Sequence, residues 1–160
     1  MAKLPTYSPL WIKYPDYIFY TSEKVKTLIG GSVEAEGIKN TCAVRLSRTL
    51  NYNGIRLPYS KTMLTKKGAD GRRYAVRVRE LRKWLVWKLG KPAFDIRKKE
   101  GAAFDKTALQ SMKGIIGFDI RFKDATGHLD LWDGRRFSNE GNMSRNAWTA
   151  STRIWVWKSA

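Results

Sequence analysis

The spacing of apolar residues changes between the two halves of the chain. In the first half, apolar residues recur at helical intervals in three segments, and Ser22 can cap the first of them. These segments are SEKVKTLIGG (22–31), TCAVRLSRTLNYNG (41–54) and RELRKWLVWKLGKP (79–92). In the second half, segments rich in β-branched and aromatic residues are separated by turn-like sequences such as KDATG. These strand-like segments are 114–122, 127–134 and 152–159. Helices followed by strands predict an α+β fold, with N-terminal helices packed on a C-terminal antiparallel β-sheet.

The length of 160 residues predicts a single domain, residues 1–160, that can bury a core without disulfides or metal. A lone cysteine excludes an internal disulfide, and Cys42 and His128 alone cannot build a zinc site, so we expect no metal or cofactor. Segment 61–73 carries glycines and few large apolar residues, which predicts a loop. No apolar run approaches the roughly 18 residues of a membrane span, and the N-terminal segment lacks a signal-peptide pattern.

The strongest compositional bias is charge. Lysine and arginine number 31 against 14 acidic residues, which gives a net charge of +17 and suits a polyanionic partner. Basic segments interleave with Trp11, Trp84 and Trp87, whose rings could stack on bases, so a nucleic-acid-binding module is one candidate function. No helix-turn-helix, zinc-finger or ribonucleoprotein motif accompanies this bias.

A cysteine amidase is the candidate of a different class, and it depends on Cys42. Asn40 or Thr41 can cap the predicted helix, which puts Cys42 in its first turn. There, free backbone N–H groups and a nearby histidine would favour a thiolate nucleophile and stabilise an oxyanion. Arg45 shares that helix face and would favour the anion further. A buried structural cysteine is the alternative that these residues leave open.

His128 is the only histidine, so it is the candidate general base. A third group should orient the imidazole, and three residues are candidates. Asp133 points to the face of the strand opposite to His128 and suits a turn. Asp130 shares the face of His128 but lies roughly 6.6–6.8 Å further along the strand. Asn139, after the next turn, offers an amide oxygen on a neighbouring element and is the preferred candidate.

Four segments, taken in order, resemble the type VI secretion amidase effector family 4, which has an NlpC-type, papain-like fold. They are NTCAVRLSRTLNYNGI (40–55), YAVRVRELRKWLVWKLGKP (74–92), KGIIGFDI (113–120) and DATGHLDLWDG (124–134). The resemblance implies a cysteine amidase, a DL-endopeptidase that hydrolyses the γ-D-glutamyl–meso-diaminopimelate bond of Gram-negative peptidoglycan stem peptides. It assigns the nucleophile to Cys42 and the base to His128. Asn139 occupies the position of the third residue, where the family commonly has aspartate.

The resemblance also implies partners and a location. We expect a peptidoglycan substrate, a cognate immunity protein, and delivery by type VI secretion components from the cytoplasm of one bacterium to the periplasm of another. Some family members carry a cysteine pair near the site, and Phe137 and Gly141 stand at those positions here. A housekeeping or phage NlpC-type cell-wall hydrolase would share this chemistry, and the basic nucleic-acid-binding module remains the alternative of another class.

Overall fold

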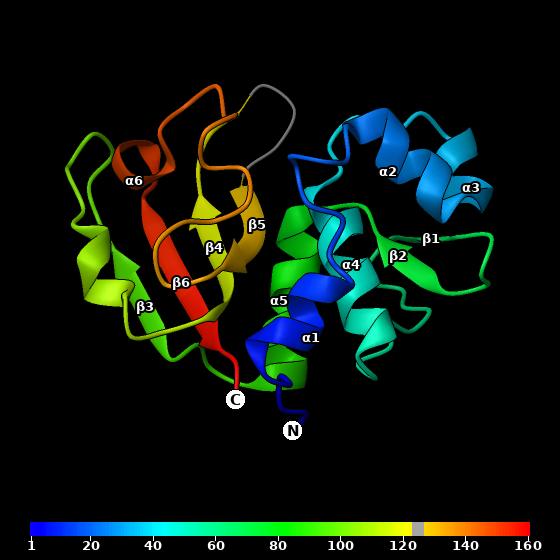
Figure 1. The fold of residues 1–160 in the computed structure, drawn as a ribbon, viewed down its shortest axis with the longest axis horizontal. Helices are drawn as coiled ribbons and strands as arrows, with labels where there is room; N and C mark the ends of the chain where they lie inside the picture. Colours follow the sequence, from blue (N-terminus) through cyan, green and yellow to red (C-terminus); the bar gives the residue numbers. More distant parts are fainter. Residues whose placement is uncertain (123–126) are drawn as a thin grey trace.

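A four-stranded antiparallel sheet forms the centre of the computed structural model, which describes residues 1–122 and 127–160. Its strands, in spatial order, are β3 (Phe94–Arg97), β6 (Arg153–Lys158), β4 (Gly114–Asp119) and β5 (Gly127–Trp132). Figure 1 shows β5 at the edge of the sheet that faces the helices. The expected turn KDATG falls on residues 123–126, outside the described residues, and only its Gly127 is seen, at the start of β5.

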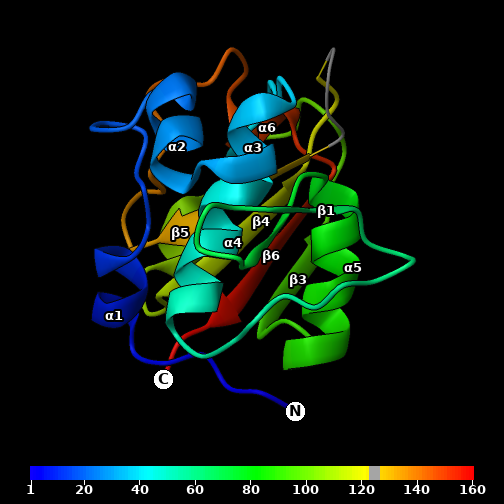
Figure 2. The same cartoon turned by 90° about the vertical axis from the view of Figure 1, so that its right-hand side faces the viewer.

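The helices precede most of the sheet in the sequence and pack against it, as the predicted α+β architecture requires. They are α1 (Tyr7–Ile12), α2 (Ser22–Ile29), α3 (Gly31–Ala35), α4 (Cys42–Tyr52) and α5 (Val78–Leu89). Figure 2 shows α4 and α5 in front of the strands, and both helices contact β5. A short α6 (Ala147–Ala150) and a 3-10 turn (Lys106–Leu109) come from the second half of the chain.

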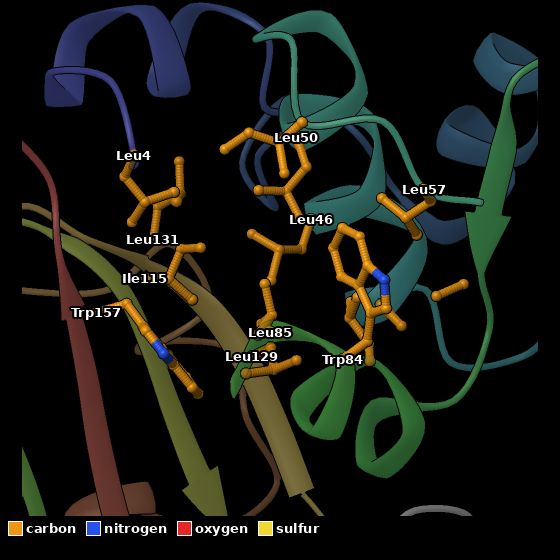
Figure 3. Packing of buried hydrophobic residues seen from close by; sticks show 14 of the residues in the cluster. Leu4, Leu46, Leu50, Leu57, Trp84, Leu85, Ile115, Leu129, Leu131 and Trp157 are labelled. Carbon is orange, nitrogen blue, oxygen red and sulfur yellow. The ribbon is translucent and has the colours of Figure 1, made fainter. Parts of the chain in front are cut away.

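Both faces of the sheet are covered, which explains why its central strands are apolar without alternation. Ile115 of β4 packs toward the helices with Leu129 and Trp157, in the core that Figure 3 shows around α4 and α5. The next residue, Ile116, joins a second core with Trp148 of α6. Successive side chains along a strand point to opposite faces, so one strand serves two cores.

Helix α4 lies at the centre of the helical layer and is buried almost all round, including its polar residues. Ser47 shows how a buried hydroxyl is accommodated there: it donates to the carbonyl of Ala43 (2.7 Å) and accepts from the N–H of Ala75 (2.9 Å). Buried polar groups need such partners, because leaving one unpaired costs roughly 1–3 kcal/mol.

The structure corrects several predicted boundaries. Segment 61–73, predicted as a loop, contributes β1 (Thr65–Lys67) and the start of β2 (Arg73–Ala75), which pair as an antiparallel hairpin. Helix α2 is capped by Thr21, whose side chain accepts the N–H of Lys24 at 3.2 Å, and Ser22 is its first residue. Gly30, at φ 67°, ends that helix, and its position is tight because an added Cβ would lie 3.0 Å from the Cβ of Ala69. None of the described helices is long and apolar enough to span a membrane.

Candidate active site

Cys42 is the first residue of α4 and is 1% exposed. Thr41 is the N-cap residue by its backbone position, but the side chain that binds a first-turn N–H is that of Asn40, whose Oδ1 accepts from Cys42 at 3.1 Å. The sequence prediction of a cysteine in the first turn is thus confirmed. The thiol lies where the helix dipole and the unpaired N–H groups favour negative charge.

His128 is the second residue of β5 and is 5% exposed. Its ring contacts those of Tyr17 and Phe137, with centroid distances of 5.9 and 5.8 Å. Its Nε2 lies 2.8 Å from Oδ2 of Asp130. These contacts from three parts of the chain fix the plane of the imidazole.

The charge state of His128 follows from two opposing effects. Burial lowers the pKa of the imidazole, but the interactions with the side chains of Asp130 and Cys42 outweigh it and raise the pKa to about 9. Because the side chain of Cys42 contributes to the raised pKa of His128, the thiol lies beside the imidazole, although the two residues belong to different layers of the fold. At neutral pH the imidazole is therefore an imidazolium, and an imidazolium stabilises a thiolate next to it.

Asp130 is fully buried and is the carboxylate that meets this imidazolium. Its Oδ1 accepts from the hydroxyl of Tyr14 (2.8 Å) and from the N–H groups of Leu131 (2.8 Å) and Ser138 (3.3 Å). Its Oδ2 accepts from the N–H of Asn139 at 3.0 Å, in addition to the contact with His128. The expectation that Asp130 lies too far along the strand is wrong, because the two side chains lean toward each other and close the gap.

Asn139 lies close to the site but acts on Asp130 through its backbone. Within residues 1–122 and 127–160, no hydrogen bond joins the side chain of Asn139 to His128. The geometry therefore favours Asp130 for the orienting position for which sequence reasoning preferred Asn139. Asp133 serves a turn, as expected: its Oδ1 accepts from the N–H groups of Arg135 (2.8 Å) and Arg136 (2.9 Å).

Arg45, expected from the sequence to favour the anion of Cys42, donates its hydrogen bonds to other groups. It is 1% exposed, and its Nε donates to Oγ1 of Thr41 at 2.9 Å. One terminal nitrogen donates to the carbonyls of Pro15 and Asp16, each at 3.0 Å, and the guanidinium lies 3.7 Å from the ring centroid of Tyr17. Arg45 therefore holds the segment that follows α1 against α4, and it is not available to bind a substrate carboxylate.

Two cavities flank this group of residues. The first, of about 300 Å³, reaches His128, Tyr17, Asn40 and Asn139 and opens the site to solvent. The second, of about 380 Å³, lies between α1 and the segment after β5, and Asn142 lines both. Side chains that line the second cavity include Tyr7, Trp11, Arg136 and Glu140.

The remaining sequence candidates are distributed over core and surface. Trp84 is only 9% exposed and belongs to the core, whereas Trp87 is 72% and Trp11 38% exposed. A row of stacking rings for a nucleic acid is therefore not formed by these three residues. Among the described residues, no group of three or more histidine, cysteine or acidic side chains is placed to hold a metal ion.

A cysteine at the start of a buried helix, facing a histidine on the adjoining antiparallel sheet, is the defining arrangement of the papain-like, NlpC-type fold. The chain matches the model of one family with that fold over residues 38–157: type VI secretion system amidase effector protein 4 (Tae4). The chain belongs to this family of amidase effectors, as the sequence motifs predicted.

Solved structures agree with that assignment. The effector in the type VI effector–immunity complex Tae4–Tai4 from Enterobacter cloacae is 30% identical, with a TM-score of 0.80 over 98% of this chain and 99% of that chain. The effector Tae4 from Enterobacter cloacae gives 28% identity and a TM-score of 0.82 over 99% and 100% of the two chains. The effector–immunity system Tae4/Tai4 from Salmonella typhimurium, at 23% identity, has the same fold with a TM-score of 0.84, covering 98% and 99%. Comparison with curated proteins found no match.

Proposed function

We propose that the chain hydrolyses the γ-D-glutamyl–meso-diaminopimelate bond of Gram-negative peptidoglycan stem peptides, with Cys42 as nucleophile. The observation that carries this proposal is that Cys42, at the start of α4, meets His128 of β5, which in turn contacts Asp130. The membership in an amidase family supplies the reaction class, amide hydrolysis. The net charge of +17 suits a substrate that bears several free carboxylates.

In the proposed mechanism, the Cys42 thiolate attacks the carbonyl carbon of the scissile amide and forms a tetrahedral oxyanion. First-turn N–H groups of α4 face the developing charge, and the N–H of Cys42 can join them by releasing Oδ1 of Asn40. The imidazolium of His128 then gives its proton to the leaving amine nitrogen, which leaves a thioester on Cys42.

Water completes the reaction. Neutral His128 takes a proton from the water that attacks the thioester, so a carboxylic acid product leaves and the thiolate–imidazolium pair is restored. Throughout these steps Asp130 holds the imidazole in one orientation and stabilises its charged form. Asn139 supports Asp130 through its N–H in this scheme.

The test is mass spectrometry of purified Gram-negative sacculi after incubation with wild-type protein or Cys42→Ala. We expect the wild type to release stem fragments cut between D-glutamate and diaminopimelate, and the variant to release none. Intact stem peptides after incubation with folded wild type would overturn the proposal. Cleavage at another amide bond would overturn the assigned bond while leaving the chemistry in place.

We further propose that the chain is an antibacterial effector that is made in the bacterial cytoplasm, delivered by a type VI secretion system to the periplasm of a target cell, and neutralised by a cognate immunity protein. Support comes from the effector–immunity complexes whose effector has this fold. The experiment directs the chain to the periplasm of a Gram-negative host cell with and without its candidate immunity protein. Lysis only without that protein is the expected result, whereas lysis by cytoplasmic expression of Cys42→Ala would contradict it and favour the nucleic-acid alternative.

A further inference from the structure

The segment Tyr14–Tyr17, called the strap here, runs between the helix that carries Cys42 and the strand that carries His128. It follows α1, and in Figure 1 the blue chain between α1 and α2 passes close to α4. Arg45 of α4 holds the strap by its two hydrogen bonds to the carbonyls of Pro15 and Asp16. On the other side, the N–H of Tyr17 donates to Oγ of Ser138 at 3.0 Å. The strap is thus fixed to both layers of the fold.

The fixed strap holds the hydroxyl of Tyr14 against the carboxylate of Asp130. Tyr14 is 4% exposed, and its hydroxyl donates to Oδ1 of Asp130 at 2.8 Å across a sequence separation of 116 residues. Among the described residues, the other donors to this carboxylate, apart from His128, are backbone N–H groups of residues near it in sequence. Tyr14 is therefore the side chain that ties Asp130 to the helical layer.

The hydroxyl of Tyr14 remains a donor throughout the working pH range. Burial and the charge of Asp130 raise the pKa of Tyr14 well above its usual value. A neutral hydroxyl that donates to a carboxylate takes up part of its negative charge, so the carboxylate attracts its other partner less strongly. The partner here is the imidazolium of His128.

We propose that Tyr14 is a positioning residue of the active site, which fixes the Asp130 carboxylate and moderates its pull on the His128 imidazolium. The function of this contact is to keep the imidazolium acidic enough to release its proton to the leaving amine. The inference deepens the proposed amidase function and rests on it for the kinetic part of its test. The NMR titration of His128 uses no substrate, so that part of the test does not depend on the proposed function.

The groups that face His128 from each neighbouring element define what else could shift its titration. Cys42 approaches from α4, Asp130 lies on the same strand, and Tyr17 approaches from the strap. The guanidinium of Arg45 lies over the ring of Tyr17. Removing the hydroxyl of Tyr14 takes a hydrogen bond from Asp130 and leaves the side chains of Cys42, Tyr17 and Arg45 unchanged. A change in the titration of His128 would therefore report on the contact between Tyr14 and Asp130.

The test compares Tyr14→Phe with Tyr74→Phe. Tyr74 is also buried and also donates to a carboxylate, Asp70 at 2.7 Å, but it belongs to another part of the core. Because His128 is the only histidine, its imidazole nitrogens give one unambiguous set of NMR signals in a pH titration. We expect the pKa of His128 to rise by about half a unit in Tyr14→Phe and to stay unchanged in Tyr74→Phe.

Kinetics on peptidoglycan give the second measurement. We expect kcat to fall about tenfold in Tyr14→Phe with little change in KM, and the alkaline limb of the pH profile to move upward. In an Asp130→Asn background, Tyr14→Phe should add nothing to either change, because the two residues act through one contact. An unchanged or lowered titration of His128 in Tyr14→Phe would overturn the proposal.

Two further measurements keep the test decisive. If wild type fails to cleave peptidoglycan, the proposed function fails, but the titration of His128 still tests the role of Tyr14. If Tyr14→Phe does not fold, the downfield hydroxyl proton of Tyr14 is observed directly in the wild type. Its loss in Asp130→Asn supports the contact, and its absence from the wild type overturns it.

Discussion

Asp130 and His128 occupy consecutive positions on one face of β5, and their side chains meet at 2.8 Å between Oδ2 and Nε2. The proposed base and the group proposed to orient it are therefore carried by a single strand. This strand pairs along its length with β4, in a register that places His128 opposite Phe118. The geometry of the pair depends on the sheet, and the segment after Gly134 contributes backbone N–H groups to it.

Replacing Asp130 should impair catalysis far more than replacing Asn139. We expect Asp130→Ala to lower kcat on the order of 10³–10⁴-fold, since the imidazole loses both its orientation and the charge that stabilises it. Asn139→Ala keeps the N–H that Asp130 accepts and should lower kcat less than about threefold. Steady-state kinetics on purified muropeptides measures both. Equal losses in the two variants would return the orienting role to the Asn139 side chain.

Stability should fall between about pH 6.5 and 9. The pKa of His128 is raised from 6.5 to about 9 on folding, so the folded protein holds a proton that the unfolded chain releases. The contribution to the free energy of unfolding is complete below pH 6.5 and is lost as the pH rises through 9, and it is on the order of 3 kcal/mol. Urea denaturation across this range measures it. In His128→Gln the same dependence should disappear, and its persistence there would assign it to other groups.

Removing the guanidinium of Arg45 should destabilise the fold and the site together. Arg45→Met leaves the carbonyls of Pro15 and Asp16 without their buried donor, at a cost of roughly 1–3 kcal/mol for each. The matched control is Arg48→Met, one turn further along α4, where the side chain is half-buried and its guanidinium lies over the ring of Tyr52. Thermal unfolding and kcat are measured for both. A stable, active Arg45→Met would show that the strap does not need this anchor.

The arginines after β5 should differ in their effect on substrate affinity. Arg136 lines the second cavity beside the site, whereas its exposed neighbour Arg135 does not. If substrate carboxylates extend into that cavity, Arg136→Ala raises KM about three- to tenfold with kcat nearly unchanged, and Arg135→Ala changes neither by more than twofold. The effect of Arg136→Ala should shrink at high salt. Identical KM values for the two variants would exclude the second cavity from substrate binding.

The positions of the proposed nucleophile and base could be predicted from sequence because each depends on local sequence patterns. A capping residue before an apolar helical repeat placed Cys42, and a β-rich segment placed His128 on a strand. The hairpin of β1 and β2 escaped prediction because each strand is three residues long and carries charged side chains. Strand β3 also escaped prediction, because it has only four residues and they alternate between half-buried and exposed positions.

The roles of Asp130 and Arg45 could not be predicted, for two different physical reasons. Asp130 was set aside on the ideal spacing of strand residues, which ignores how far two facing side chains can lean toward each other. Arg45 was expected to favour the thiolate from a shared helix face, and its burial could not be foreseen because a charged residue is rarely buried. Its burial depends on two carbonyl groups that lie 29 and 30 positions earlier in the sequence. A local sequence pattern cannot predict partners at that separation.

The separation of Cys42 and His128 into different layers has a consequence for folding kinetics. The two residues meet only after the helical layer docks on the sheet, and contacts between residues so distant in sequence form slowly because they close a long loop. A compact intermediate with native helices but undocked strands would hold a solitary thiol and no imidazolium beside it. During refolding, enzymatic activity should therefore return after the helical signal in circular dichroism, together with the burial of the tryptophans of β6.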